Sequence, residues 1–242
     1  MAEKERFTVG VMGGMGPDAT VDFMAKVVEM TDSGRDQDHV HMIVDQNPTV
    51  PDRQAAISEG RTDVSDALGE MARGLEDAGA DFLVMVCNTA HVFLDGVHAR
   101  TSIPFISIIE ESIRAIDRLR PAAKKVGVMA TAGCLDTRIY QDAVTASGRE
   151  ALVPEGGDMA ELMDLIKAIK SGDKGESVRR GMQASADKLV QRGAEIIIAG
   201  CTEIPIVFSG ENCASPVVSS TDVLARRTLE LAQGLQPLPG KH

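Results

Sequence analysis

One short pattern occurs twice in this 242-residue chain and constrains its fold more than any other feature. It consists of a glycine, an apolar run and a cysteine eight positions after the glycine, as GADFLVMVC at Gly79–Cys87 and GAEIIIAGC at Gly193–Cys201. A short, continuous apolar run is typical of a strand that is buried on both faces, as in a parallel sheet. In the first copy, Leu68, Met71 and Leu75 precede the run at helical spacing, and the glycine stands where such a helix ends. Each copy therefore predicts a helix followed by a buried parallel strand.

The repetition extends over most of the chain. VGVM at residues 9–12 recurs at residues 126–129, and Pro104 has a counterpart in Pro216. The offset between the copies drifts from 117 through 114 at the cysteines to 112 at the prolines. A drifting offset indicates two diverged copies with small deletions in their loops.

We therefore predict an α/β fold with two similar three-layer lobes, each with a mainly parallel sheet, related by a pseudo-twofold axis. The predicted first lobe is discontinuous and comprises residues 1–104 and 215–242, and the second comprises residues 105–214. Ligands in open α/β sheets bind at the carboxyl ends of strands, so we expect one active site between the lobes.

Composition narrows the classes of function. A net charge of −11 argues against nucleic-acid binding. No apolar run approaches the roughly 18 residues of a membrane span, and the charged N-terminus does not resemble a secretory signal. Four cysteines without a CxxC or HxxxH pair argue against both a disulfide framework and a zinc site. We expect a cytoplasmic protein with no metal.

The paired cysteines are the candidates for chemistry. Polar residues follow each of them, and a helix N-terminus after each is expected to lower the thiol pKa from about 8.5. Two thiols that face each other across a cleft suit two-base proton transfer, in which one thiolate removes a proton from carbon and the other thiol donates one to the opposite face. That reaction is a racemisation or an epimerisation. The alternative is that both cysteines are buried small hydrophobic residues, which the repetition disfavours.

Five motifs support a more specific interpretation. They are GGMGPDAT at Gly13–Thr20, NPTVPDR at Asn47–Arg53, CNTAH at Cys87–His91, IKSG at Ile169–Gly172 and GCTEIP at Gly200–Pro205. In content and order they resemble the aspartate/glutamate racemase family of cofactor-independent amino-acid racemases. The resemblance implies that Cys201 takes the α-proton of the L-enantiomer and Cys87 that of the D-enantiomer. Some relatives carry threonine at the first position and act in one direction, so Cys87 implies a reversible enzyme. A homodimer is implied by the resemblance alone.

The same resemblance implies a set of substrate-binding residues, namely Met15, Arg53, Asn88, Thr89, Thr131, Lys170 and Thr202. Arg53 and Lys170 match cations that hold the substrate carboxylates, and an acidic amino acid requires such paired cations. From the residues alone, Arg53 also fits a solvated loop cation, and Lys170 fits a residue that complements a helix C-terminus. Cys134 departs from the threonine that is more common in the family, which leaves the polar contacts of that turn open.

The sequence thus predicts a pyridoxal-independent racemase that interconverts L- and D-aspartate. Glutamate is a second candidate substrate, because one methylene group discriminates only modestly in binding. A broader acidic substrate or a maleate-type isomerase activity stays open. The expected partner is a small acidic amino acid, with no nucleic acid, no membrane and no cofactor.

Two alternatives belong to other functional classes. The turn Gly14–Ala19 fits GxGxxA after a strand, and Asp45 ends the next strand, as in a dinucleotide-dependent enzyme. The second alternative is a non-catalytic sensor of acidic amino acids. We expect His91 to be a structural residue rather than a base, and Cys213 to be an exposed loop thiol.

Overall fold

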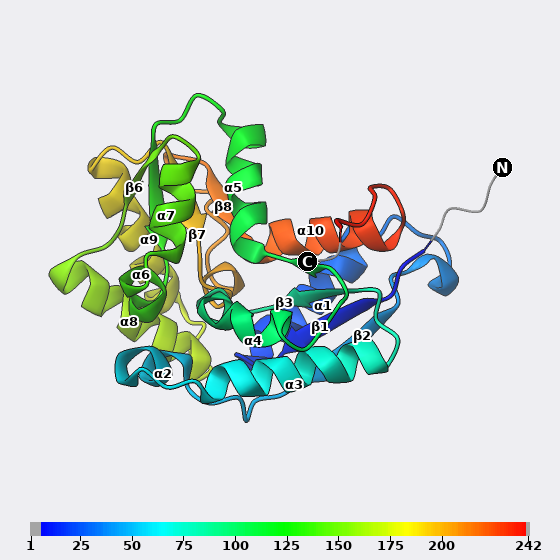
Figure 1. Cartoon of the computed structure of the whole chain (residues 1–242). Coiled ribbons are helices and arrows are strands. Elements are labelled where there is room, and N and C mark those ends of the chain that lie inside the picture. The colour runs from blue at the N-terminus through cyan, green and yellow to red at the C-terminus, as the bar shows by residue number, and fades with distance from the viewer. Residues whose placement is uncertain (1–5, 241–242) are drawn as a thin grey trace. The chain divides into compact units, whose positions relative to one another are not determined.

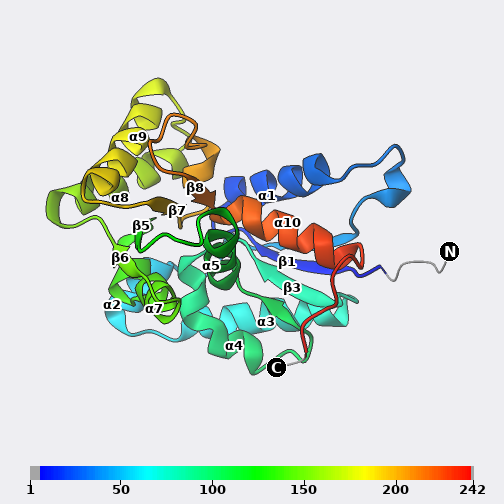
Figure 2. The same cartoon turned by 90° about the horizontal axis from the view of Figure 1, so that it is seen from above.

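Two four-stranded parallel sheets, each with helices on both faces, make up the chain in a computed structural model that describes residues 6–240 (Figures 1 and 2). The predicted α/β class with parallel sheets is confirmed. The chain divides into two compact units, the first with the residues up to Ile108 and from Leu224 onward, the second Ile109–Val223. The junctions follow residues 108 and 223, and each comes after the last strand of its sheet. In the described residues, no helix has the length and apolar character that crossing a membrane requires.

The first unit contains the sheet of order β2-β1-β3-β4. Its strands are β1 Val9–Gly13, β2 Met42–Gln46, β3 Phe82–Met85 and β4 Phe105–Ile106. Its helices are α1 Pro17–Met30, η1 Asp36–Asp38, α2 Arg53–Glu59, α3 Asp63–Asp77, η2 Thr89–Phe93, α4 Leu94–His98 and the part of α10 (Ser220–Ala232) that follows Val223. Both views place α1 and α10 on one face of this sheet and α3 and α4 on the other (Figures 1 and 2).

The second unit contains the sheet of order β6-β5-β7-β8, which has the same connectivity. Its strands are β5 Lys125–Met129, β6 Glu150–Leu152, β7 Ile196–Ala199 and β8 Val217–Ser219. Its helices are α5 Ile108–Leu119, α6 Ala132–Asp136, α7 Ile139–Ala146, α8 Gly156–Lys170, α9 Glu176–Gln191 and η3 Ile204–Ile206. Figure 2 shows α8 and α9 on one face of this sheet and α5 and α7 on the other.

The two units repeat each other down to single packing contacts. A methyl group added at Gly10 of β1 would lie 2.7 Å from Leu83 Cδ2, and one added at Gly127 of β5 would lie 2.4 Å from Ile197 Cδ1. The two glycines hold equivalent places in the repeat, and at each the neighbouring strand fills the space of the missing side chain. Close packing of this kind leaves no room for an added methylene group. The repeat seen in the sequence is therefore a repeat in the packing of two cores.

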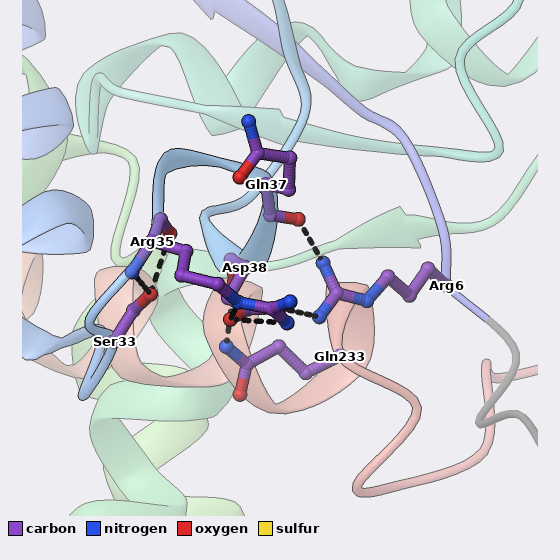
Figure 3. A network of polar contacts seen from close by, with 6 residues as sticks. All are labelled: Arg6, Ser33, Arg35, Gln37, Asp38 and Gln233. Atoms are coloured by element: carbon purple, nitrogen blue, oxygen red, sulfur yellow. Dashed lines mark hydrogen bonds and ion pairs between the residues drawn. The ribbon is translucent and has the colours of Figure 1, made fainter.

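A polar network in the first unit joins Arg6, which precedes β1, to Gln233, which follows α10 (Figure 3). The Arg6 guanidinium donates to the Gln37 carbonyl oxygen at 2.6 Å and pairs with Asp38 Oδ1 at 3.1 Å. Arg35 Nε donates to Asp38 Oδ2 at 2.9 Å, and this bond lowers the pKa of Asp38 below its usual value. Gln233, just after α10, donates to the Asp38 carbonyl oxygen at 3.5 Å. The η1 turn thereby links the residue that leads into β1 to the end of α10.

Candidate functional site

Cys87 follows the end of the central strand β3 in the first unit. All four residues of β3 are buried, and the next N–H group, that of Val86, donates to the Met12 carbonyl oxygen at 3.0 Å. That bond carries the β1–β3 pairing one residue past the strand and fixes where the cysteine emerges. The Cys87 side chain is 6% exposed and lies in the same buried cluster as Met15. Cys87 and Met15, the methionine of the glycine-rich turn, thus belong to one buried cluster of the first unit.

His91 fixes the backbone of Cys87 rather than acting on its thiol. Its Nδ1 lies 2.8 Å from the Cys87 carbonyl oxygen, and its Nε2 accepts the Ile108 N–H at 3.2 Å. This pattern places the ring proton on Nδ1, because a carbonyl can only accept and an N–H can only donate. Burial lowers the pKa of His91 to about 4, so the ring is neutral at physiological pH. These contacts give His91 the structural role expected from the sequence.

Three further predicted residues belong to the first unit. Asn88 and Thr89 are 2% and 6% exposed at the start of η2. Arg53 is the first residue of α2, and its Nη1 donates to the carbonyl oxygens of Val50 and Pro51 at 3.0 and 2.9 Å. No carboxylate among the described residues pairs with Arg53. Its half-buried guanidinium is thus held in place by one nitrogen and keeps donors for a carboxylate ligand.

The glycine-rich turn after β1 is filled by protein. Gly14 has φ of +89°, and a methyl group there would lie 2.4 Å from the backbone carbon of Asn47. The Gly14 N–H donates to Thr20 Oγ1 at 2.9 Å. In the pattern GxGxxA, Gly14 is the first glycine, which serves the tight turn. The loop that contains Asn47 packs against this glycine, so protein lies against the start of the turn.

Cys201 occupies the equivalent place in the second unit. The Gly200 N–H donates to the Met129 carbonyl oxygen at 2.8 Å, as Val86 does to Met12. The Cys201 side chain is 5% exposed, and its Sγ donates to Glu203 Oε2 at 2.9 Å. Glu203 is itself 3% exposed, and its Oε1 lies 3.5 Å from Lys170 Nζ at the end of α8. Cys201, Glu203 and Lys170 therefore form a continuous buried chain of polar contacts that reaches the surface at the half-exposed lysine.

The expected lowering of the thiol pKa is wrong for Cys201. Burial raises the pKa of Cys201 well above its ordinary value, the charge of Glu203 raises it further, and Lys170 opposes both. The expected helix N-termini are also short. Cys87 is followed by the five-residue 3₁₀ turn η2, and Cys201 by the three-residue turn η3, which contains Pro205. Such single turns carry little of the dipole of a long helix.

The remaining predicted residues belong to the second unit. Thr131 is 5% exposed, and its Oγ1 accepts the Cys134 N–H at 3.4 Å at the start of α6. Cys134 is fully buried, and Thr202 is 1% exposed. Cys213 is half-buried rather than exposed, because its side chain packs against the core of this unit.

The structure thus assembles the predicted residues into two groups, one in each unit. Glu203 is not among the site residues predicted from the sequence, although it makes a polar contact to the Cys201 thiol. The signal was present, since Glu203 belongs to the GCTEIP motif and comes two residues after the cysteine.

Comparisons with known proteins place this geometry in a family. Residues 12–228 match the family described as Asp/Glu/Hydantoin racemase. The broad specificity amino-acid racemase RacX of Bacillus subtilis (strain 168) is 30% identical over 227 residues, which cover 91% of this chain and 96% of that protein. The structure of an aspartate racemase from Picrophilus torridus has a TM-score of 0.83 at 26% identity and covers 96% of each chain. An aspartate racemase homologue from Pyrococcus horikoshii OT3 shares the fold, with a TM-score of 0.76 at 24% identity over 93% of this chain and 98% of that chain.

Proposed function

The chain belongs to the Asp/Glu/hydantoin racemase family and is an amino-acid racemase, and we propose that it interconverts L- and D-aspartate through Cys87 and Cys201. One observation carries the assignment of the cysteines. Each thiol follows the central strand of its sheet by two residues, and each strand end is fixed by the same backbone bond to the neighbouring strand. Two thiols with equivalent positions in the two units suit the two opposite proton transfers of one reaction.

The proposed reaction needs a thiolate and a thiol on opposite faces of the substrate α-carbon. The thiolate removes the α-proton and becomes a thiol, and the electron pair of the C–H bond stays on the substrate as a carbanion next to the carboxylate. The opposite thiol then donates its proton to the other face and becomes the thiolate. Cys201 takes the proton from L-aspartate and Cys87 takes it from D-aspartate. No redox cofactor is consumed, because one proton leaves the substrate and one proton returns.

The substrate is held through its charged groups. Arg53 suits the side-chain carboxylate, because a guanidinium fixed by one nitrogen can still form a charge-assisted bond with a carboxylate through the others. Lys170 supplies the second cation. The polar residues proposed to bind the α-carboxylate and amine are Asn88, Thr89, Thr131 and Thr202, with Met15 in the adjacent turn.

Aspartate is proposed over glutamate on the strength of the Picrophilus torridus relative, which is named as an aspartate racemase. The Bacillus subtilis relative is named as a broad-specificity enzyme, so glutamate stays the second candidate substrate. A homodimer and a cytoplasmic location are parts of the same proposal.

The test is exchange of the α-hydrogen by the purified protein without added cofactor. We expect L-aspartate in D₂O to gain α-deuterium by NMR and D-aspartate to appear by chiral chromatography, with glutamate slower and alanine slowest. Activity should survive dialysis against EDTA and treatment with hydroxylamine but not alkylation of the thiols. A clear preference for glutamate or for a neutral amino acid would overturn the aspartate assignment, and binding of aspartate without exchange would favour a sensor.

A further inference from the structure

We propose that Glu203 is a positioning residue that keeps Cys201 as a protonated, hydrogen-bonding thiol. Lys170 is the counter-charge that offsets part of the effect of Glu203 on the thiol. This inference rests on the proposed racemase function, in which Cys201 alternates between acid and base. It assigns Cys201 a protonated resting state.

The contact geometry defines the direction of the hydrogen bond. The Cys201 Sγ and Glu203 Oε2 atoms are 2.9 Å apart, and an ionised carboxylate can only accept, so the thiol carries the proton. The two groups are 5% and 3% exposed, so water provides little screening between them. Among the described residues Glu203 Oε1 has no hydrogen-bond partner, although Lys170 Nζ lies 3.5 Å away. Oε2 accepts from the thiol and, at 3.5 Å, from the Thr202 hydroxyl.

The charges around Cys201 disfavour ionisation of its thiol. A thiolate beside an ionised carboxylate would place two negative charges in contact in a buried site, where like charges strongly disfavour ionisation. The pair consequently holds one proton and titrates as a unit. Lys170 approaches from the end of α8 and offsets part of the negative charge.

Two more side chains belong to the surroundings of Gly200 and Cys201. Tyr140 approaches from α7, and its ring would lie 2.7 Å from a methyl group added at Gly200. Burial raises the pKa of Tyr140 far above its usual value, so the phenol stays protonated. Cys134 lies in α6 near the same ring and is fully buried. Glu203 and Lys170 are thus the charged groups that act on the Cys201 thiol.

The position equivalent to Glu203 in the first unit carries a residue without charge. At the offset of 114 that relates the cysteines, Glu203 corresponds to Thr89 in the first unit. A threonine hydroxyl has no charge with which to hold a thiol proton. When Cys201 acts as the base, its proton first moves to the Glu203 carboxylate, which gives a thiolate and a carboxylic acid. The thiolate then takes the substrate α-proton and becomes a thiol again. The Glu203 acid releases its proton to solvent, and Cys87, which has given its proton to the substrate, takes one from solvent.

The test measures ionisation of Cys201 without relying on turnover. The full-length enzyme is treated with iodoacetamide over a range of pH, and peptide mass spectrometry gives the alkylation rate of each cysteine. In Glu203→Gln, which keeps the shape but removes the charge, we expect the midpoint for Cys201 to fall by about one pH unit. Alkylation below the midpoint should then be about tenfold faster than in the wild type. The Cys213 rate and the matched control Glu161→Gln, an exposed acid on α8, should not change.

A second variant has the opposite expected sign. Lys170→Gln removes the counter-charge, so the Cys201 midpoint should rise and alkylation should slow. This variant also decides the question if Glu203→Gln does not fold. A Cys201 midpoint that stays unchanged or rises in Glu203→Gln, or that does not rise in Lys170→Gln, would overturn the inference.

The pH profile of racemisation separates this inference from the proposed function. In Glu203→Gln the bell-shaped profile of kcat/KM should move to lower pH, a change that a purely structural role would not produce. An enzyme that racemises aspartate without either shift retains the proposed function and contradicts the role of Glu203. A wild-type enzyme that fails to racemise contradicts the proposed function itself, whatever the thiol titration gives.

Discussion

At the residue scale, His91 and Glu203 contact the two cysteines in different ways. His91 donates to the backbone carbonyl of Cys87, whereas Glu203 accepts from the thiol of Cys201. The first contact fixes the position of a loop, and the second acts on ionisation. The two halves of the repeat have therefore diverged in the chemistry next to equivalent thiols.

The buried neutral His91 makes stability depend on pH. Its pKa falls from 6.5 in the unfolded chain to about 4 in the fold, so its contribution is complete above pH 6.5 and is lost as the pH falls toward 4. Between pH 7 and pH 5 this one residue should lower the free energy of unfolding by on the order of 2 kcal/mol. Urea unfolding at both pH values measures the loss.

The variant His91→Gln isolates this effect from the other titrating groups. It should be less stable than the wild type at pH 7, because two buried hydrogen bonds are disturbed, by about 1–3 kcal/mol. It should lose less stability than the wild type between pH 7 and pH 5. An equal loss in both proteins would show that His91 titrates normally in the fold.

Arg53 should discriminate substrates by charge. Arg53→Ala removes a charge-assisted bond of about 1.5–3 kcal/mol, which predicts a loss of roughly 10- to 100-fold in kcat/KM for aspartate. Alanine, which lacks the side-chain carboxylate, should be barely affected. Arg61→Ala, just beyond α2 and paired with Glu59 and Asp63, is the matched control and should leave both substrates unchanged. Equal losses for aspartate and alanine would exclude Arg53 as the residue that binds the side-chain carboxylate.

At the element scale, the strands could be predicted well and the short helices could not. The two apolar runs that precede the cysteines contain β3 and β7, as predicted. Continuous apolar runs are strong local signals. In contrast, the sequence does not predict α2. It has only seven residues, too few to show a period, and it is stabilised by the Asp52 cap and by the burial of Ala56.

The same limit applies to the candidate site. Motifs located the cysteines, but the contact between Lys170 and Glu203 joins two segments that are distant in sequence. No local pattern reports such a contact. The raised pKa of Cys201 could not be foreseen either, because it depends on burial and on a neighbouring charge rather than on the helix that the sequence led us to expect.

The close helix–strand packing of each unit predicts a matched pair of destabilising substitutions. Gly10→Ala would place a methyl group 3.1 Å from Leu75 Cβ of α3, and Gly127→Ala would place one 3.2 Å from Leu189 Cβ of α9, besides the closer strand contacts. Each should cost about 1–3 kcal/mol in the free energy of unfolding. Gly74→Ala, within α3 and with no atom near the added methyl group, should instead stabilise by about 0.5–1 kcal/mol. Chemical unfolding of the three variants measures these values. If Gly10→Ala were as harmless as Gly74→Ala, the described packing would be wrong.

At the scale of the whole molecule, the proposed function requires both units. Each unit contributes one thiol, one cation and a set of buried polar residues, and neither set alone could move a proton off one face of a carbon and onto the other. The internal repeat explains how such a pair arises, since duplication of one helix–strand design places a cysteine at the end of each central strand. The later divergence of Glu203 from Thr89 makes the two thiols unequal.

The measurement that tests the two-thiol mechanism most directly is α-deuterium incorporation in D₂O, followed by NMR separately from L- and D-aspartate. Cys201→Ser should abolish exchange from L-aspartate and keep slow exchange from D-aspartate, because a hydroxyl is a far weaker base than a thiolate. Cys87→Ser should show the reverse, and neither variant should racemise. If both single variants kept nearly wild-type racemisation, Cys87 and Cys201 would be buried core residues and the mechanism would be wrong.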